Sequence, residues 1–244
     1  MGSLIVIDRY TMFCKRILLI SLIASLVIVA CKKDEAPEQV DQGYDYFPTQ
    51  VGTWVEYQVD SMWRDDAANV WDSVNYRLLE RIEGTYSDLE GRPALRIQRY
   101  VKNLNDEWTI RDVWTATRNT IAAEKTEEDV RRQKLAFPVR DARSWDINVY
   151  NAEGELKVAM REVGSPKTIN GLSYAETVLV KNTVPLNFVL DRTYEERYAK
   201  SVGLVSKLWV DLETQNRWVE TSQQFVTERR GFRLTMTAVA HGTE

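Results

Sequence analysis

The sequence predicts a mainly β domain. We expect a single large, strongly curved antiparallel sheet, a half-barrel or barrel-like meander, with at most one or two short helices. Two observations lead to this fold class. Apolar and polar residues alternate along most of the chain after Trp54, which is the period of half-buried strands. Short turn-forming segments interrupt the alternation about every 10 to 20 residues, as in consecutive hairpins.

The alternation identifies the strands in chain order. One wet and one dry face per strand is typical of antiparallel sheets. A sheet of roughly eight or more such strands must curl, close or split in two. The clearest strands are Val55–Val59, Val74–Ile82, Trp145–Val149, Leu156–Met160, Leu172–Val180 and Phe232–Ala238.

Turn chemistry marks the joints between these strands. Asn151–Gly154 and Thr168–Gly171 each end in a glycine, which reverses the chain by adopting positive φ. Three further segments, Arg64–Asn69, Asn103–Asp106 and Leu212–Asn216, are polar and are predicted to be loops.

Two segments are compatible with a helix. Thr126–Lys134 begins with a capping residue, has acidic residues early and basic residues late, and so suits the helix dipole. A strand over Asp129–Phe137 fits the same residues equally well. Tyr194–Lys200 could form a helical turn, although no residue requires it.

The N-terminus has the layout of an export signal. Lys15 and Arg16 supply positive charge, Ile17–Val29 is apolar, and a small Ala30 precedes Cys31. The last four residues of this stretch look like a lipobox, in which the cysteine is acylated, for example with palmitate, and becomes the first mature residue. We therefore expect Cys31 to be the lipid attachment site.

Three alternatives bear on this leader. Translation could start at Met12 instead of Met1, which gives a more compact signal. A transmembrane helix is a poorer fit, because only about 15 uncharged residues lie between Arg16 and Lys32 and a span needs roughly 20. Cleavage without lipid is the remaining alternative.

The domain boundaries follow from the leader. Residues 1–30 are expected to be a removed signal peptide, 31–42 the lipidated cysteine with a flexible tether, and 43–244 the β-rich domain. Lys32–Glu35 resembles the lysine-then-acids signal of surface-exported lipoproteins, although a solvated tether explains the same charges. Ala36–Gln42 is polar and lacks apolar periodicity, as a disordered linker does.

Composition excludes several kinds of chemistry. The first 30 residues hold three basic residues and one acidic residue, so the mature chain has 29 basic and 35 acidic residues and a net charge of −6. Such a chain gains nothing from the phosphates of nucleic acid. Cys14 and Cys31 are the only cysteines, which leaves the domain without a thiol. The only histidine, His241, lies near the C-terminus, where we expect a tail residue.

Three stretches resemble an uncharacterised family of lipoproteins from Bacteroidetes-type bacteria. Tyr46–Tyr57 is similar to the opening Tyr-Phe-Pro, Gly and Trp pattern of that family. Lys134–Val139 with Ser144–Asp146 is similar to a second motif, and Glu196–Val205 to a Tyr-Ala-Lys…Val-Gly-Leu-Val signature. This chain departs from the pattern at Ser201, where the family has Gly, and before Ser144. The resemblance implies a β-rich fold and no known activity.

Candidate contact residues are few. Trp63 and Trp71 flank the Arg64–Asn69 loop and could form a cross-strand pair, which beside Asp65 and Asp66 would suit a glycan or a partner. A hairpin held together by aromatic packing explains them as well. The carboxylates of Glu127–Asp129, Asp191 and Glu195–Glu196, and the Arg131–Arg132 and Arg229–Arg230 pairs, are expected on solvated strand faces.

The sequence therefore indicates a lipid-anchored protein of the outer membrane or cell surface, without a cofactor, metal or catalytic residue. The first functional hypothesis is a non-catalytic binding module, which holds an apolar or amphipathic ligand on the concave sheet in an apolar cavity of several hundred Å³. The alternative is an envelope protein that docks a protein or glycan through exposed aromatics. A hydrolase that uses only carboxylates is a third, weaker hypothesis.

Overall fold

The computed structural model describes residues 40–182 and 189–244. Asp41–Glu244 forms one compact unit. The expected signal peptide and Cys31 lie outside the described residues. Asp41 and Gln42, at the end of the expected tether, already contact the domain: Lys200 pairs with the Asp41 carboxylate at 2.9 Å, and the Val139 amide donates to the Gln42 carbonyl at 3.0 Å.

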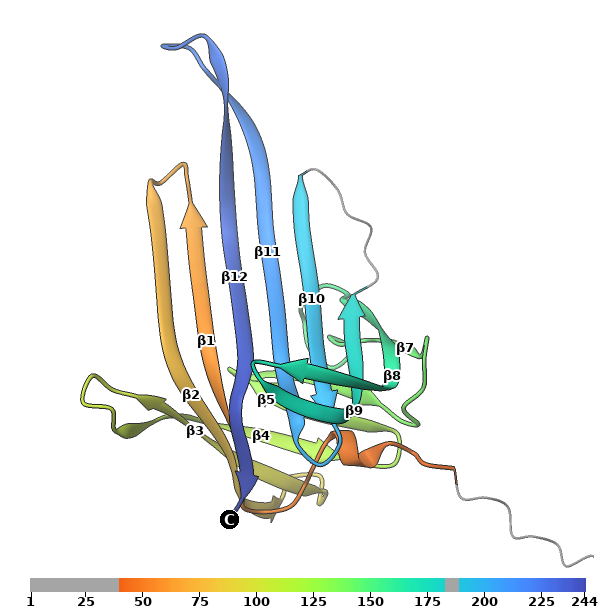
Figure 1. The fold of residues 1–244 in the computed structure, drawn as a ribbon. Coiled ribbons are helices and arrows are strands. Elements are labelled where there is room, and N and C mark those ends of the chain that lie inside the picture. Colours follow the sequence, from red (N-terminus) through yellow and green to blue (C-terminus); the bar gives the residue numbers. More distant parts are fainter. Residues whose placement is uncertain (1–39, 183–188) are drawn as a thin grey trace, which may run out of the picture. The chain divides into compact units, whose positions relative to one another are not determined.

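The chain forms one twelve-stranded antiparallel sheet, which confirms the expected fold class (Figure 1). A single turn of 3-10 helix, Tyr44–Tyr46, precedes it. The strands are β1 (Thr53–Asp65), β2 (Val70–Ser87), β3 (Pro93–Lys102), β4 (Trp108–Arg118), β5 (Ala122–Glu127), β6 (Val130–Ala136), β7 (Ser144–Asp146), β8 (Lys157–Ile169), β9 (Leu172–Asn182), β10 (Leu190–Ala199), β11 (Gly203–Val219) and β12 (Gln224–Thr243).

The sheet consists of two meanders joined at the chain ends. Its order is β6-β5-β4-β3-β2-β1-β12-β11-β10-β9-β8-β7, so β1 pairs with β12 and all other neighbours are consecutive in sequence. The outermost strands β6 and β7 approach each other. The Gln133 amide donates to the Ile147 carbonyl, and the Trp145 indole donates to the Gln133 carbonyl, both at 2.9 Å. The sheet is therefore nearly closed into a barrel.

Most expected turns are confirmed, although Gly154 does not have the positive φ that was expected of it. In the β8–β9 hairpin, Asn170 and Gly171 have φ of 48° and 82°, as a two-residue type I′ turn requires. The expected loop at Leu212–Asn216 is wrong, because β11 runs through it in register with β12 up to Val219. This segment has no Gly or Pro to end the strand.

Both expected helices are also wrong. Thr126–Lys134 instead contains the turn between β5 and β6, where Glu128 and Asp129 have φ of 49° and 63°. The alternative strand over Asp129–Phe137 agrees closely with β6. Tyr194–Lys200 lies mostly in β10. His241 is likewise not a tail residue. It lies in β12 opposite Val55 of β1, and its ring centroid lies 5.6 Å from that of Tyr174.

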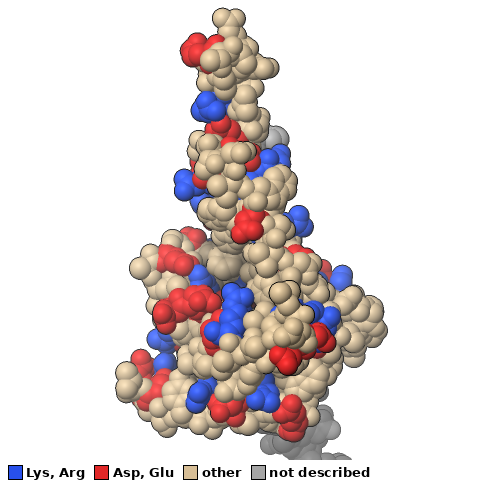
Figure 2. Space-filling view, turned by 90° about the vertical axis from the view of Figure 1, so that its left-hand side faces the viewer, with Lys and Arg blue, Asp and Glu red and all other residues tan. Residues whose placement is uncertain are grey.

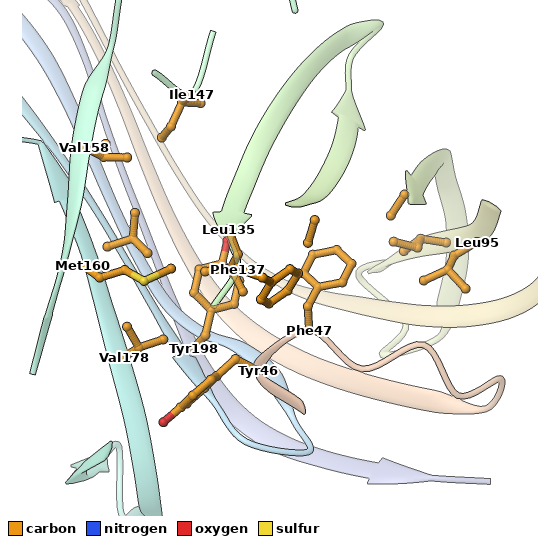
Figure 3. Close-up of a cluster of buried hydrophobic side chains, with 14 of the residues drawn as sticks. Tyr46, Phe47, Leu95, Leu135, Phe137, Ile147, Val158, Met160, Val178 and Tyr198 are labelled. Atoms are coloured by element: carbon orange, nitrogen blue, oxygen red, sulfur yellow. The ribbon is translucent and has the colours of Figure 1, made fainter. Parts of the chain in front are cut away.

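Two hydrophobic clusters fill the inside of the sheet. In the larger one, Phe47 and Phe137 lie between Met160 on one side and Leu95 on the other (Figure 3). The smaller one is centred on β1 and β12. Two of the family-like stretches meet beside the core, because a Cβ atom on Gly203 would lie 3.2 Å from Cδ of Pro48. These motif residues therefore stabilise the fold.

The β11–β12 hairpin extends beyond its neighbours (Figure 1). The last pair between β1 and β12 is Asp65 with Arg230, and the last pair between β10 and β11 is Leu190 with Glu213. We call the part of the hairpin outside these pairs, residues 214–229, the arm. Its end carries few charged side chains, whereas the rest of the visible face mixes both signs (Figure 2).

Gly231 lies at the base of the arm and accommodates a close approach of β11. Its φ is 134°, and a Cβ atom there would lie 1.9 Å from the Asp211 carbonyl oxygen. We expect Gly231→Ala to lower the free energy of unfolding by about 1–3 kcal/mol or more, through backbone strain and displacement of β11. Urea titration followed by tryptophan fluorescence measures this loss.

Gly84→Ala is the matched control, because a Cβ atom at Gly84 meets nothing within 4 Å and its φ is not positive. Equal stability losses in the two variants would show that the close contact at Gly231 is not responsible.

Candidate functional site: an inner groove above a buried charge network

Alternation in β10, β11 and β12 selects which side chains face the inside of the sheet. Tyr194 is opposite Trp209, Glu196 is opposite Lys207, and all four side chains lie on the inner face. Because residues two apart on a strand share a face, β10 and β11 each contribute an aromatic and a charged side chain to the interior.

Glu196 and Lys207 form a closed ring of alternating charge with two further buried residues, Glu127 and Lys134. Lys134 lies 2.6 Å from Glu196 and 3.1 Å from Glu127, while Lys207 lies 3.1 Å from Glu196 and 3.5 Å from Glu127. All four residues are buried. Two tyrosine hydroxyl groups complete the ring: Tyr198 donates to Glu196 at 2.6 Å, and Tyr194 accepts from Lys134 at 2.9 Å.

A second buried group continues the network toward β2, β3 and β4. Glu80 contacts Lys125 at 2.7 Å and Arg99 at 3.0 Å, and Arg99 contacts Asp112 at 2.9 Å. The Arg99 guanidinium stacks on Trp114, with its central carbon 3.4 Å from the ring centroid. The two groups together contain four cationic and four anionic side chains. Their formal charges cancel, so the network has no net charge with which to attract an ion.

The pairing sets the protonation states of the ring. Burial alone would raise the pKa of Glu196, but Lys134 and Lys207 outweigh burial and lower that pKa to about 2. The same two ammonium groups hold the pKa of Glu127 well below its usual value. Burial alone would lower the pKa of Lys134, but the carboxylates of Glu127 and Glu196 raise it. All four groups are therefore charged at neutral pH.

The interior leaves little free volume beside this network. A cavity of about 80 Å³ has apolar walls that include Phe47, Ile82 and Leu95, and it also borders the charged residues Glu80 and Lys134. The expected apolar cavity of several hundred Å³ is not found inside the described part of the sheet. Large side chains and paired charges fill that space instead.

A groove of about 480 Å³ lies on the same inner face, at the edge of the core. One wall is the inner face of β10–β12, with Tyr194, Trp209 and Phe232. The opposite wall is the loop between β7 and β8, with Glu153 and Leu156. The groove thus combines an aromatic wall with a polar rim.

Edge-to-face contacts order the aromatic wall. The ring centroids of Tyr194 and Trp209 are 5.6 Å apart, and those of Trp209 and Phe232 are 5.3 Å apart. Arg132 lies over the Trp209 ring at 5.2 Å and also bonds Glu153 at 2.6 Å, so it ties the loop to this wall. Asn182, Arg192 and Asp211 supply hydrogen-bonding groups along the rim.

The structure separates the two tryptophans proposed from the sequence. Trp63 is opposite Phe232 and Asp72, whereas Trp71 is opposite Arg64, so the two indoles lie on opposite faces of the hairpin. The expected cross-strand pair is wrong. Trp63 is 44% exposed and continues the aromatic row of the groove. Trp71 is 65% exposed, with the Arg64 guanidinium 4.7 Å from its ring centroid.

The carboxylates beside these tryptophans already have partners within the chain. Asp66 accepts from the Arg64 side chain at 2.5 Å and from the Arg229 amide at 2.9 Å, and Asp65 lies 3.3 Å from Arg230. A role for Trp63 and Trp71 in contacting a glycan or partner stays a prediction.

Two residues of the charge network were assigned to the wrong face from sequence. Glu127 and Glu196 were expected on solvated faces, yet both are buried, while Glu128, Asp129 and Asp191 are exposed as expected. The signal was in the alternation itself. Tyr194, Glu196 and Tyr198 share one phase of β10, so Glu196 belongs to the apolar face.

Two kinds of feature are absent from the described residues. Across 40–182 and 189–244, no group of three or more His, Cys, Asp and Glu side chains is placed to hold a metal ion. No helix in this part of the chain has the length and apolar character needed to cross a membrane.

The ring predicts a defined loss of stability in acid. The carboxylate pKa of Glu196 is lower in the folded protein than its ordinary value of 4.5, so its contribution is present above that pH and is lost as pH falls toward about 2. At pH 7, Glu196→Gln leaves Lys134 and Lys207 underpaired and should cost about 3–5 kcal/mol. The difference from the wild type should shrink between pH 4.5 and 2, as measured by urea unfolding.

Glu195→Gln is the control from the adjacent position on β10, where the side chain faces outward and is 35% exposed. If the two variants lose equal stability at pH 7, the buried ring does not have the predicted role.

Comparisons with known proteins give no family for this chain. No protein-family model matches it. No curated protein matches it either. Among solved structures, one similar chain is a Bacteroides fragilis protein titled a "putative exported protein with YmcC-like fold", with 8% sequence identity and a TM-score of 0.40. The alignment covers 81% of this chain and 98% of that one. At this TM-score, the likeness supports no conclusion about this protein.

Proposed function

We propose that this protein is an exported lipoprotein, anchored through Cys31 at the outer membrane or cell surface, whose domain is a non-catalytic binding module for an amphipathic ligand. The groove between β10–β12 and the β7–β8 loop would hold the ligand. The observation that carries the proposal is the volume of about 480 Å³ in combination with an aromatic wall and a polar rim. This volume lies within the range typical of small-molecule sites.

An amphipathic ligand fits better than a purely apolar one. The interior of the sheet is occupied by paired charges, so an apolar molecule has no room there. In the groove, aromatic rings of Trp209 and Phe232 can cover an apolar part. Arg192 and Asp211, which pair with each other at 3.3 Å, keep further donor and acceptor groups for a polar part.

Apolar side chains continue beyond the groove on the same face. Trp63 follows Phe232 across the β1–β12 pair, and Val74 of β2 is 48% exposed on that face. Four strand spacings of about 4.8 Å separate β10 from β2, so this strip is about 19 Å long, and it also includes Asp211 opposite Phe232 and Asp72 opposite Trp63. An elongated apolar part of the ligand could lie along this strip.

Docking of an envelope protein or glycan is the second candidate function. Its support is the exposure of Trp71, Trp218 and Phe225, at 65%, 43% and 69%. These residues lie on the opposite face from the groove, so the two functions use different surfaces and can be tested separately.

The first test compares masses of the chain from Ala36 onward under native and denaturing conditions. A mass surplus that disappears on denaturation indicates a co-purified small molecule and supports the groove. A native mass equal to that of the bare chain would instead favour the docking function.

The second test uses the amphipathic dye 1-anilinonaphthalene-8-sulfonate as a probe of the groove. Phe232→Ala removes part of the aromatic wall and should weaken dye binding about tenfold, as expected for one aromatic contact. Phe225→Ala is the control, because Phe225 is exposed on the other face of β12. If both variants bind the dye as the wild type does, the groove is not the binding site.

Lipidation is tested independently by metabolic labelling with an alkyne analogue of palmitate. The full-length protein should incorporate the label and fractionate with membranes. Cys31→Ala should abolish both, whereas Cys14→Ala, within the removed leader, should change neither. Labelling that persists in Cys31→Ala would contradict the proposed anchor.

A further inference from the structure

The arm exposes a strand edge on β12 whose hydrogen-bonding groups can be identified one by one. The last residue pair between β1 and β12 is Asp65 with Arg230, and the next residue, Asp66, also contacts β12. Its amide donates to the Arg229 carbonyl at 3.0 Å, and its carboxylate accepts from the Arg229 amide at 2.9 Å. The backbone groups of Arg229 therefore point to the β1 side of the arm and are both occupied.

The next free groups follow from antiparallel geometry. Backbone groups alternate between the two sides of a strand, so those of Thr227 and Phe225 point to the same side as those of Arg229. Within the described residues, no strand pairs with β12 on this side beyond Asp65. Thr227 and Phe225 thus offer two N–H and two C=O groups at an open edge.

The arm also lacks three of the features that usually prevent edge pairing. Residues 214–229 contain no proline and no lysine, and the β11–β12 register there has no bulge. Phe225 is 69% exposed and Val226 is 39% exposed, so the edge is accompanied by apolar side chains.

We propose that the β12 edge of the arm pairs with the same edge of a second copy of this chain, antiparallel and around a two-fold axis at Val226. In this register, Phe225 of each copy is opposite Thr227 of the other. These two pairs exchange four backbone hydrogen bonds, and the Asp66 bonds to Arg229 remain intact. An axis at Thr227 would instead place Phe225 opposite Arg229, whose groups are occupied.

The side chains fit this register. The two Phe225–Thr227 pairs combine an aromatic with a β-branched residue, and Val226 packs against Val226, both of which are favourable cross-strand pairs. Gln224 lies opposite Glu228 of the second copy, so no like charges meet. A two-fold contact also closes on itself and does not propagate into fibres.

The other edge of the arm is a poorer self-partner. The Thr214 amide donates to the Val189 carbonyl at 2.6 Å, so Asn216 and Trp218 point to the open side of β11. Pairing these two residues across a two-fold axis would place Arg217 directly opposite Arg217. Like charges opposite each other destabilise a strand pair, so the β12 edge is favoured.

Cross-linking tests the register. A chain that begins at Ala36 has no cysteine, because Cys14 and Cys31 precede it, and it keeps the whole compact unit Asp41–Glu244. In the proposed register, residue 226 of one copy lies opposite residue 226 of the other, as a pair without mutual hydrogen bonds. In Val226→Cys the two Cα atoms of this pair would be about 4.5 Å apart, within the range that a disulfide spans. Mild oxidation should therefore give a covalent dimer.

The matched variant is Arg217→Cys, on the neighbouring strand directly opposite Val226. It should cross-link much more slowly than Val226→Cys, because the proposed axis does not pass through it. Equal rates for the two variants, or no dimer from Val226→Cys, would overturn the proposal.

Sedimentation velocity over a series of protein concentrations tests the edge itself. Thr227→Pro removes an N–H group at the open edge but leaves the backbone hydrogen bonds of Val226 and Glu228 to β11 intact. It should weaken self-association by about tenfold or more. Thr227→Val keeps that N–H, loses the same bond from Thr227 to Asn216, and should dimerise like the wild type. A wild-type chain that stays monomeric at all concentrations would reject the pairing.

Discussion

The antiparallel pairing of the first strand with the last is the contact on which the rest of the molecule depends. β1 and β12 pair from Thr53 opposite Thr243 to Asp65 opposite Arg230. Without this pair, the order of strands would give two separate six-stranded meanders, with open edges along β1 and β12. With it, one continuous sheet can curl until β6 and β7 meet, and a single interior forms from both halves of the chain.

That interior explains why the groove lies at the edge of the core. Alternation places Glu127, Lys134, Glu196 and Lys207 inside, and removing unpaired charges from water is costly. Each of these groups finds opposite charges on strands that are distant in sequence, so the set is neutral and fully paired. The space that an internal ligand would need is thereby filled. The groove beside the β7–β8 loop remains open, with Trp209 linking it to the network beneath through Lys207 and Arg132.

Unequal strand lengths divide the molecule into surfaces with different chemistry. Up to the base of the arm, β12 pairs with β1 and β11 pairs with β10. Beyond it, β11 and β12 continue alone as the arm. A two-stranded ribbon has two solvated faces and two open edges, and it is marginal in isolation. The aromatic pair Trp218–Phe225, with ring centroids 5.1 Å apart, supports one face of it. The groove and the arm are therefore separate surfaces, the one a hollow with an aromatic wall and the other a two-stranded ribbon with open edges.

The sequence by itself determined the strands, their alternation and several turns, because these depend on neighbours two to four residues away. Asn170–Gly171 is an example, since positive φ at both residues selects a tight hairpin. The sequence also indicated a lipid anchor at Cys31, which the described residues do not reach. Only the tertiary structure decided that Trp63 and Trp71 face opposite ways, which charges pair with the buried Glu196, and that Leu212–Asn216 continues a strand. These outcomes depend on strand register and on contacts between residues about 60 to 80 positions apart, such as Lys134 with Glu196 and Glu127 with Lys207, which no local pattern encodes.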